Sequence, residues 1–442
     1  MKNFIFISPN FPDTYYRFCE GLKKNGFRVL GIGGCSYNEL RPELKACLDE
    51  FYECWDMDNF ENEVNAVRYF ENKYGHIDYL ESLNEYWLEK DARLREIFNI
   101  DTGIKGNEIE VYQHKSMMKE KYKLAGVKTA QYILIDTYDN ALKFVEKVGY
   151  PIFAKPDKGV GAQGDFKIKN NEDLKDFFAK KEPNVTYICE QYVTGNIVSF
   201  DGICDSHSNV IFATSECFPP SISEIAKNNL DTLYYCLPDI PSDLKKIGPK
   251  VIKAFNVKNR FFHLEFFRLT QDIKGLGKVG DIIGLETNMR APGGYTPDLI
   301  NFANSVNVYQ IWADGMAFDC NKQDMSHPKY FAVCASRRDN ANYFYNTEDI
   351  LRTFANNICC HGRYPDVLSD CMGNYYYMAK FESEEEVELF HQYVNKRVGD
   401  FSLPKAVHYV TKEKYGEGFR ILKEQNSKSK KKNICDTHID GA

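Results

Sequence analysis

The chain has 442 residues, which is enough for roughly three domains of about 150 residues each. Apolar residues make up 43% and charged residues 27% of it, as in ordinary globular proteins, so the chain can form several cores without disulfides or structural metals. Its 56 lysines and arginines against 63 aspartates and glutamates give a net charge of −7, which argues against a general nucleic-acid-binding protein but allows a local basic pocket for a phosphate.

Cysteine spacing and hydropathy indicate an intracellular protein. None of the 14 cysteines forms a C-x-x-C pair, and only Cys359 and Cys360 are adjacent, so we expect reduced, buried thiols rather than metal sites or disulfides. The first apolar stretch, Phe4 to Ile7, is too short for a secretory signal, and no stretch approaches the ~18 apolar residues of a membrane span. We therefore expect a cytoplasmic, soluble protein that binds neither membranes nor nucleic acids.

The beginning of the chain alternates between short apolar runs and segments with helical spacing. The runs and helical segments fall, in order, at 3–8, 15–25, 27–32, 60–74, 77–82 and 85–98. This alternation predicts βαβ units and a parallel sheet, and so a small doubly wound α/β domain over residues 1–110. No G-x-G-x-x-G follows the first strand, so this domain is not predicted to bind a dinucleotide.

The middle of the chain predicts two lobes of mixed α+β structure. Residues 111–192 alternate between helices and short strands and form the smaller lobe. Residues 195–214 and 260–290 predict long antiparallel hairpins in a larger lobe at 193–330. Between these hairpins, residues 216–245 contain four prolines and little periodicity, which predicts an insert or a mobile loop.

The end of the chain predicts a further α+β segment at 331–425. Ser383 precedes three glutamates, a pattern typical of a helix start with an N-cap and an acidic first turn. The lysine-rich residues 426–442 are predicted to form a disordered tail.

A glycine-rich loop follows an apolar strand that ends in Lys155. The loop contains Gly159, Gly161 and Gly164, and a second apolar strand follows it. Glycines allow backbone N–H groups to approach a polyphosphate closely, and Lys155 supplies a cation beside the loop. This is not a Walker A loop, because the lysine precedes the glycines and no helix follows. Taken alone, the pattern also fits an ordinary glycine-rich hairpin.

A second polar pattern occurs on two later strands. In an extended strand Glu286, Asn288 and Arg290 point to the same side, and Glu265 lies within a run of aromatic residues on the preceding strand. Carboxylate and amide oxygens suit Mg²⁺, and a guanidinium suits phosphate or carboxylate. The alternative is a polar solvent face, although a carboxylate among aromatic residues is costly without a cation. The spacing between the two glutamates predicts an enlarged turn at Gln271 to Gly280.

These motifs resemble, in their order along residues 1–425, the ATP-grasp superfamily. The segment beginning His114-Lys115 resembles the one that carries the first ATP lysine of that family, and Cys189 to Gly195 resembles its adenine-binding hinge. The resemblance implies an α/β and α+β multidomain fold of ATP-grasp architecture behind the N-terminal doubly wound α/β domain. It implies ATP binding by Lys115, Lys155, Gly159, Gly161, Gly164, Glu190, Gln191 and Val193, metal binding by Glu265, Glu286 and Asn288, and catalytic roles for Arg290 and Lys155.

Two positions depart from the pattern of that family. Ala162 stands where the glycine-rich loop often carries a hydroxyl, and Ile197 stands where some members have a ribose-binding glutamate. Asp201 is either a substitute for that glutamate or a plain strand residue. The source of a ribose contact therefore stays open at this stage.

The stretches around Lys155 and Glu286 most resemble the amino-acid carboxylate–amine ligases, which form dipeptides. This implies a ligase that uses ATP and Mg²⁺, with Mn²⁺ as an alternative, and forms an amide from an amino-acid carboxylate and an amine through an acyl phosphate. Biotin carboxylase and carbamoyl phosphate synthetase share the architecture, but Ala-Pro-Gly-Gly after Arg290 replaces the Gln-Val-Glu-His associated with biotin-dependent carboxylases. An inactive nucleotide-binding protein is a further alternative, against which the intact metal set counts. The oligomeric state stays open, with a homodimer as one expectation.

Overall fold

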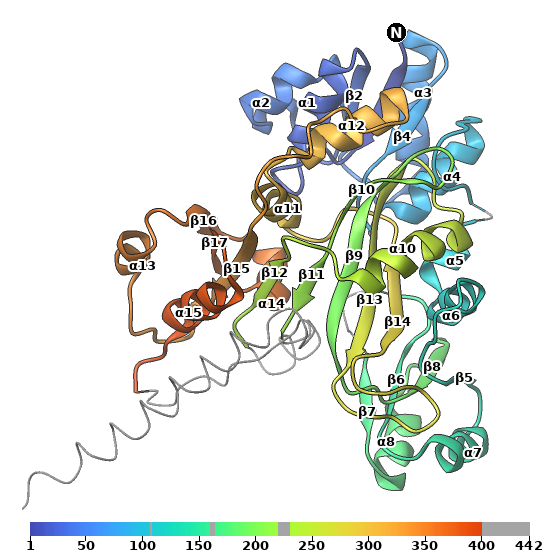
Figure 1. Ribbon diagram of the computed structural model, residues 1–442. Helices are drawn as coiled ribbons and strands as arrows, with labels where there is room; N and C mark the ends of the chain where they lie inside the picture. The colour runs from blue at the N-terminus through green and yellow to red at the C-terminus, as the bar shows by residue number, and fades with distance from the viewer. Residues whose placement is uncertain (107, 160–163, 220–229, 400–442) are drawn as a thin grey trace, which may run out of the picture.

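The computed structural model describes residues 1–106, 108–159, 164–219 and 230–399 (Figure 1). The predicted tail at 426–442, the end of the segment at 331–425, the middle of the predicted insert and Gly161 of the glycine-rich loop lie outside the described residues. Helices and strands are mixed along the described ranges, which confirms the expected α/β and α+β fold class.

The N-terminal part is a parallel four-stranded sheet with strand order β3-β2-β1-β4. Its strands and helices are β1 (Asn3–Ile7), α1 (Tyr16–Lys24), β2 (Arg28–Gly33), the 3-10 helix η1 (Tyr37–Glu39), α2 (Pro42–Cys47), β3 (Glu50–Glu53), α3 (Phe60–Tyr74), β4 (Tyr79–Glu81) and α4 (Leu88–Ile97). All five residues of β1 are buried, as expected for a central parallel strand that is covered on both faces. The predicted doubly wound unit is therefore present.

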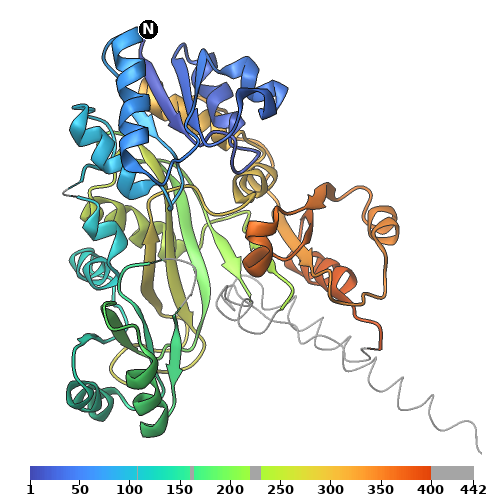
Figure 2. The same ribbon diagram turned by 180° about the vertical axis from the view of Figure 1, so that it is seen from behind.

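A second, antiparallel sheet with the order β5-β8-β6-β7 forms the opposite end of the molecule (Figure 2). Its elements are α5 (Glu110–Gln113), α6 (Lys115–Leu124), β5 (Tyr132–Ile135), α7 (Tyr138–Val148), β6 (Ile152–Pro156), β7 (Phe166–Ile168), α8 (Asn171–Lys180) and β8 (Tyr187–Gln191). Strands β6 and β7 pair across the glycine-rich loop, as the sequence predicts.

A nine-stranded sheet lies between these two ends and extends to one side. Its strand order is β14-β13-β9-β11-β12-β15-β17-β16, with β10 paired to β9. Its strands and the helices that accompany them are β9 (Gly195–Cys204), β10 (Val210–Thr214), β11 (Glu216–Phe218), β12 (Leu233–Cys236), α10 (Ser242–Phe255), β13 (Arg260–Leu269), β14 (Ile282–Asn288), α11 (Thr296–Asn304), α12 (Val308–Phe318), β15 (Phe331–Arg337), α13 (Thr347–Thr353), β16 (Ile358–Arg363), the 3-10 helix η2 (Asp366–Leu368), α14 (Ser369–Met372), β17 (Tyr375–Phe381) and α15 (Glu384–Asn395).

The predicted insert at 216–245 is wrong in part. Strands β11 and β12 lie inside the large sheet, between β9 and β15, and α10 begins within the same range. The strands escape detection because they have only three and four residues, and all four residues of β12 are buried, which removes the alternation that marks a half-exposed strand.

Two local predictions in the later part of the chain are confirmed. Residues 271–280 form the enlarged turn between β13 and β14, in which the N–H of Gly280 donates to the carbonyl of Leu269. Ser383 caps α15, and its side chain and that of Glu386 form a capping box. Since β15, β16 and β17 continue the large sheet, the division of the chain into domains stays a prediction.

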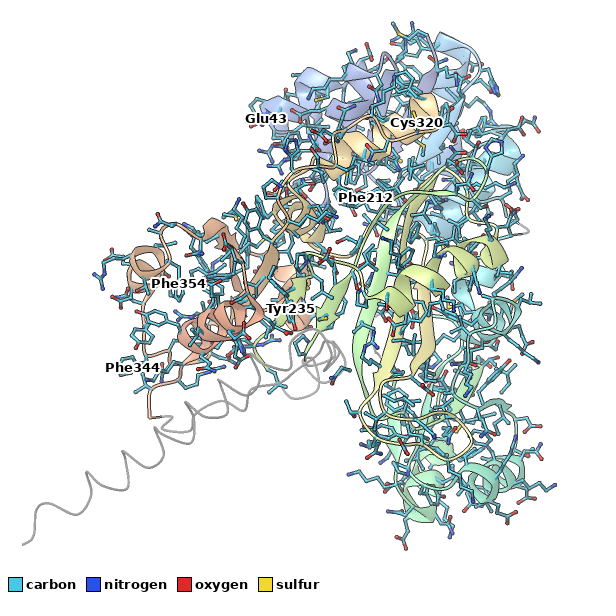
Figure 3. All side chains as sticks on the ribbon, in the orientation of Figure 1. Glu43, Phe212, Tyr235, Cys320, Phe344 and Phe354 are labelled. Carbon is cyan, nitrogen blue, oxygen red and sulfur yellow. The ribbon has the colours of Figure 1, made fainter. Side chains whose placement is uncertain are left out.

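The N-terminal unit is joined to the large sheet by a shared core and a buried ion cluster. Helix α12 packs against α1, and Phe212 of β10 belongs to the same hydrophobic core (Figure 3). The carboxylate of Glu81, at the end of β4, accepts hydrogen bonds from Arg95 at 3.1 Å and from Arg260 of β13 at 2.7 and 2.8 Å. These hydrogen bonds between Glu81, Arg95 and Arg260 hold the end of β4 against β13, the strand that also carries Glu265.

None of the helices in the described ranges combines the length and the apolar character that a membrane crossing requires.

Candidate active site

A cavity of about 1150 Å³ lies where the small sheet faces β9, β13 and β14 of the large sheet. It contains most of the predicted site residues. Those that line it are Lys115, Lys155, Gly159, Gly164, Glu190, Gln191, Val193, Glu265, Glu286, Asn288 and Arg290. The structure therefore brings together residues that are up to 175 positions apart in the chain, whereas their individual roles stay predictions.

The start of α6 is anchored to the loop after β6 by the buried carboxylate of Asp157. This carboxylate accepts hydrogen bonds from the backbone N–H and the hydroxyl of Ser116, both at 2.8 Å, and it contacts Nδ1 of His114 at 2.9 Å. In this position the ammonium group of Lys115 donates to the carbonyl of Gly159 at 2.7 Å. The contacts hold Lys115 beside the first glycine of the loop.

A buried cluster of two lysines and one glutamate stands next to this loop, and we call it the lysine–glutamate cluster. Oε1 of Glu190 lies 2.8 Å from Nζ of Lys119, and Oε2 lies 3.4 Å from Nζ of Lys155. Burial alone would raise the pKa of Glu190, but the two lysines lower it from 4.5 to about 2. Burial lowers the pKa of Lys119, whereas Glu190 and Glu286 hold that of Lys155 above its ordinary value despite burial.

The glycines at the edges of the loop adopt conformations that other residues rarely take. Gly159 has φ of +135° and Gly164 has φ of +78°, which side chains with a Cβ disfavour. Gln191 and Val193 line the cavity at the end of β8 and in the turn after it, and the backbone N–H of Gln191 donates to the carbonyl of Gln131 at 2.8 Å. The predicted hinge thus follows directly from the strand that carries Glu190.

The predicted metal ligands lie on neighbouring antiparallel strands. Glu265 of β13 is directly opposite Glu286 of β14, and His263 is directly opposite Asn288. We call Glu265 and Glu286 the carboxylate pair. Opposed side chains of this kind have Cβ atoms about 4.5–5.5 Å apart, and two like charges in such a position repel each other unless a cation lies between them. The carboxylate pair and the Asn288 amide therefore form an oxygen donor set that suits a hard divalent cation.

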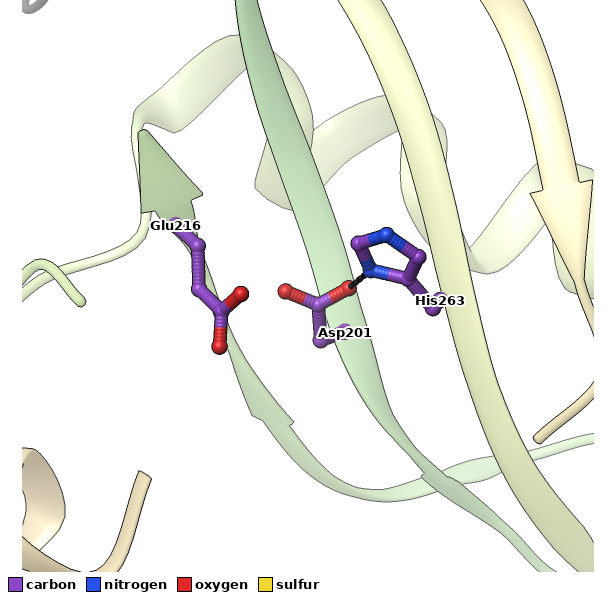
Figure 4. A group of neighbouring side chains, drawn as sticks. All are labelled: Asp201, Glu216 and His263. Atoms are coloured by element: carbon purple, nitrogen blue, oxygen red, sulfur yellow. Dashed lines mark hydrogen bonds and ion pairs between the residues drawn. The ribbon is translucent and has the colours of Figure 1, made fainter. Parts of the chain in front are cut away.

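A chain of buried polar groups leads away from Glu265 into the large sheet, and Figure 4 shows its members His263 and Asp201. Nε2 of His263 lies 3.0 Å from Oε1 of Glu265, and its Nδ1 lies 2.5 Å from Oδ1 of Asp201, which also accepts from Ser199. Burial opposes protonation of His263, but Asp201 and Glu265 raise its pKa to about 10. The resulting imidazolium lowers the pKa of Glu265 against the effect of burial.

Glu216 of β11 points toward Asp201 from the far side of this chain, as Figure 4 shows. Burial raises the pKa of Glu216 well above its ordinary value, and the charge of Asp201 adds to this effect. Ligand atoms of Asp201, Glu216 and His263 lie within 4.8 Å of one another. However, both ring nitrogens of His263 already face carboxylates, so the ring has no lone pair to offer a metal.

Arg290 is held by a residue of the N-terminal unit. Its Nε lies 3.0 Å from Oε2 of Glu85, which follows β4, and its Nη2 lies 3.5 Å from Oδ1 of Asn288. Burial raises the pKa of Glu85, and Arg290 opposes this shift. The guanidinium is thus positioned at the boundary between the N-terminal unit and the carboxylate pair.

The suggestion that Asp201 replaces a ribose-binding glutamate is wrong. Its side chain is fully buried and is bonded to His263 and Ser199, whereas Ile197 lines the cavity. Ile197 and Asp201 are four residues apart on β9 and so lie on the same face of the strand. Alternation along the sequence therefore could not separate the residue that lines the cavity from the buried one.

Sequence reasoning missed three residues that contact the predicted site. Lys119 lies one helical turn after Lys115 on α6, so its i, i+4 spacing was a usable signal. The pattern His263-Leu-Glu265 placed the histidine on the same side of the strand as the glutamate, which was also readable. Glu85 gave no local signal, because it comes from a loop of another unit.

The chain is similar in sequence to known proteins over part of its length. Residues 114–223 match the family model "Carbamoyl-phosphate synthase L chain, ATP binding domain". Over 246 residues the chain is 23% identical to an L-arginine-specific L-amino acid ligase of Bacillus subtilis, a match that covers 54% of this chain and 57% of that relative. The chain thus spans little more than half the length of this curated relative.

Solved structures of the same architecture cover most of the chain. An L-amino acid ligase from Bacillus licheniformis superimposes with a TM-score of 0.65 at 16% identity and covers 89% of this chain and 96% of its own. The biotin carboxylase domain of the Hydrogenobacter thermophilus 2-oxoglutarate carboxylase, crystallised with MgADP, ADP and bicarbonate, reaches 0.63 at 16% identity over 88% of each chain. Likeness at these identities shows a shared fold.

Proposed function

We propose that the chain is an ATP-grasp protein and that it is an ATP-dependent ligase that joins a carboxylic acid to an amine. One observation carries the proposal. The carboxylate pair, Asn288 and Arg290 meet Lys115 and Lys155 in a single cavity, so groups suited to a cation, a carboxylate and a polyphosphate face the same space. The likeness to two amino acid ligases supports amino acids as the substrates.

Magnesium fits the donor set, because it prefers hard oxygen ligands and shares the phosphate oxygens of its substrate. Glu265, Glu286 and Asn288 would hold it, and Mn²⁺ accepts the same donors. When bound, the ion neutralises charge on the phosphates. The repulsion within the carboxylate pair is the structural feature that calls for a cation at this place.

The reaction runs in two steps. In the first, a carboxylate oxygen of the substrate attacks the γ-phosphorus of ATP, the bond to the β-phosphate oxygen breaks, and ADP and an acyl phosphate form. In the second, an amine attacks the acyl carbon, loses a proton and displaces inorganic phosphate. Arg290 orients the carboxylate, while Lys155 and the amides of the glycine-rich loop stabilise the charge on the phosphates.

The proposal is tested by trapping the acyl phosphate. With ATP, Mg²⁺ and a mixture of amino acids, hydroxylamine should give a hydroxamate, and phosphate should be released in buffer depleted of bicarbonate. The protein should act in the cytoplasm on small molecules, and we leave its oligomeric state, with a homodimer as one option, to measurement.

A carboxylase is the second candidate, because a biotin carboxylase domain shares the fold at a similar TM-score. Phosphate release that depends strictly on bicarbonate, without any hydroxamate, would favour this candidate over the ligase. A lack of phosphate release under all conditions would favour an inactive nucleotide-binding protein.

A further inference from the structure

The charged side chains that line the cavity are confined to one part of it. In the described part of the lining they come from α6, the small sheet and its adjoining loops, and from β13, β14 and the residues just after β14. On the side of Arg290 and His263 that faces away from the small sheet, the described residues that line the cavity are uncharged. This part of the lining consists of Phe218, Pro219, Tyr234, Pro292, Gly293, Gly294, Thr296, Leu368, Cys371 and Met372, and we call it the apolar end.

The strand order places the apolar end on the side of the carboxylate pair that faces away from the lysines. Going from β13 through β9, the sheet continues to β11 with Phe218 and to β12 with Tyr234. Neighbouring strands are about 4.8 Å apart, so these residues lie roughly 10 and 14 Å across the sheet from Glu265. The ring of Phe218 contacts that of His263 at 5.9 Å and stacks on that of Tyr234 at 5.8 Å. The apolar end therefore begins directly beside His263, at the edge of the charged part of the cavity.

The polar groups at and behind the apolar end already have partners. The hydroxyl of Thr296 donates to the carbonyl of Gly293 at 2.7 Å. Arg338 lies behind the lining and donates to the carbonyls of Leu230, Ser369 and Asp370, which holds α14 in place. Within the described residues, the apolar end thus offers no charged lining group to a charged ligand.

We propose that the apolar end receives the side chain of the amino acid whose carboxylate is activated, and that this side chain is apolar. The inference rests on the proposed ligase function. A carboxylate beside Arg290 that faces phosphates on the lysine side must direct the rest of its molecule the other way, toward Phe218, Tyr234 and Met372. A lysine, arginine or glutamate side chain would lose its hydration there without gaining an ion partner.

Gly293 offers a way to fill this space without disturbing the fold. It lines the cavity, its φ lies outside the left-handed region, and a Cβ built on it has no heavy atom within 4 Å. Gly293→Val should therefore fold and narrow the apolar end. Gly294 is unsuitable, since its φ is +62° and its Cβ would lie 3.0 Å from Cε of Met372. Met372→Ala enlarges the same space, and Leu389→Ala on the exposed side of α15 is a matched control outside the cavity.

The experiment measures hydroxamate formation by the full chain with ATP, Mg²⁺, hydroxylamine and one amino acid at a time. Because hydroxylamine replaces the amine substrate, the assay reports only the amino acid that supplies the carboxylate. We expect kcat/KM for leucine, methionine or phenylalanine to exceed that for alanine by at least about tenfold and that for lysine, arginine and glutamate by about 100-fold. Gly293→Val should lower the leucine-to-alanine ratio by about tenfold, Met372→Ala should shift preference toward phenylalanine, and Leu389→Ala should leave all ratios unchanged.

Two results would overturn the inference while leaving the ligase intact: a charged amino acid that is used as well as leucine, or a leucine-to-alanine ratio that Gly293→Val does not change. If no amino acid gives a hydroxamate although the protein binds ATP, the proposed function itself fails, and the inference fails with it.

Discussion

The lysine–glutamate cluster and the carboxylate pair line the same cavity, but their charges are arranged in opposite ways. Glu190 lies between the ammonium groups of Lys119 and Lys155, so each charge in the cluster has an opposite charge beside it within the protein. The carboxylate pair places two like charges opposite each other, and in the described residues only Glu265 has a hydrogen-bonded side-chain partner, His263, while Lys155 acts on both carboxylates at longer range. The first group therefore has a role in stability before any ligand binds, whereas the second needs a cation from outside.

The sharpest test of this difference is Glu286→Ala. The substitution removes one carboxylate of the pair, so we expect phosphate release to fall about 1,000-fold or more, since a bound cation supplies several kcal/mol of charge stabilisation in the transition state. Stability should stay the same or rise slightly, because a like-charge repulsion disappears. Phosphate release and the thermal midpoint report the two effects separately.

Glu146→Gln, on the exposed face of α7, is a matched control that removes a carboxylate far from the cavity lining and should change neither quantity. Full activity of Glu286→Ala at low magnesium would remove this residue from the site.

Glu190→Gln, in contrast to Glu286→Ala, should lower the stability of the folded protein. It leaves two buried ammonium groups without their carboxylate, and breaking a buried ion pair in this way costs about 3–5 kcal/mol. The unfolding midpoint should fall by several degrees. Saturating ATP should restore more stability to this variant than to the parent protein, because phosphate oxygens replace the lost charge beside Lys155. An unchanged midpoint would mean that the cluster is not a stabilising element.

The two groups also differ in how far the sequence predicted them. Alternation in β14 put Glu286 and Asn288 on one side of the strand, and both line the cavity. Arg290 also lines the cavity, but it lies two residues after the end of β14, so strand alternation does not account for its position. The direct opposition of Glu265 and Glu286 could not be read, because it depends on the register across an enlarged turn. The alternation of side chains can be read along a single strand, whereas the register depends on how two strands pair.

The lysine–glutamate cluster shows the other limit. Lys155 and Glu190 were both predicted near ATP, but nothing in the sequence indicated that they pair with each other and with Lys119, since this requires the β6–β8 pairing and the packing of α6. The contact of Glu85 with Arg290 was equally hidden, because the N-terminal unit and β14 are separate in sequence. The fold class was predictable from periodicity, whereas charge pairing between elements was not.

His263→Asn tests whether His263 orients Glu265 and compensates its charge within the carboxylate pair. The substitution removes the ring that joins Glu265 to Asp201, so Glu265 loses both its orientation and a compensating charge. Losing such a partner of a metal ligand typically costs 10–100-fold in metal affinity or activity. We expect the magnesium concentration for half-maximal phosphate release to rise by that factor. His207→Asn, on the exposed turn before β10, should leave it unchanged.

The smallest expected effect is a pH dependence that belongs to the lysine–glutamate cluster alone. Because the pKa of Glu190 is lowered from 4.5 to about 2 in the folded protein, its contribution to stability is fully present above pH 4.5 and is lost as the pH falls toward 2. Glu190→Gln has no carboxylate to titrate at this position. The difference in unfolding free energy between the parent protein and this variant should therefore be constant from pH 7 to about 5 and should shrink below that. A difference that stays constant down to pH 3 would show that Glu190 is not held by Lys119 and Lys155. Glu286→Ala leaves Glu190 paired with both lysines, so this variant should keep the loss of stability as the pH falls toward 2.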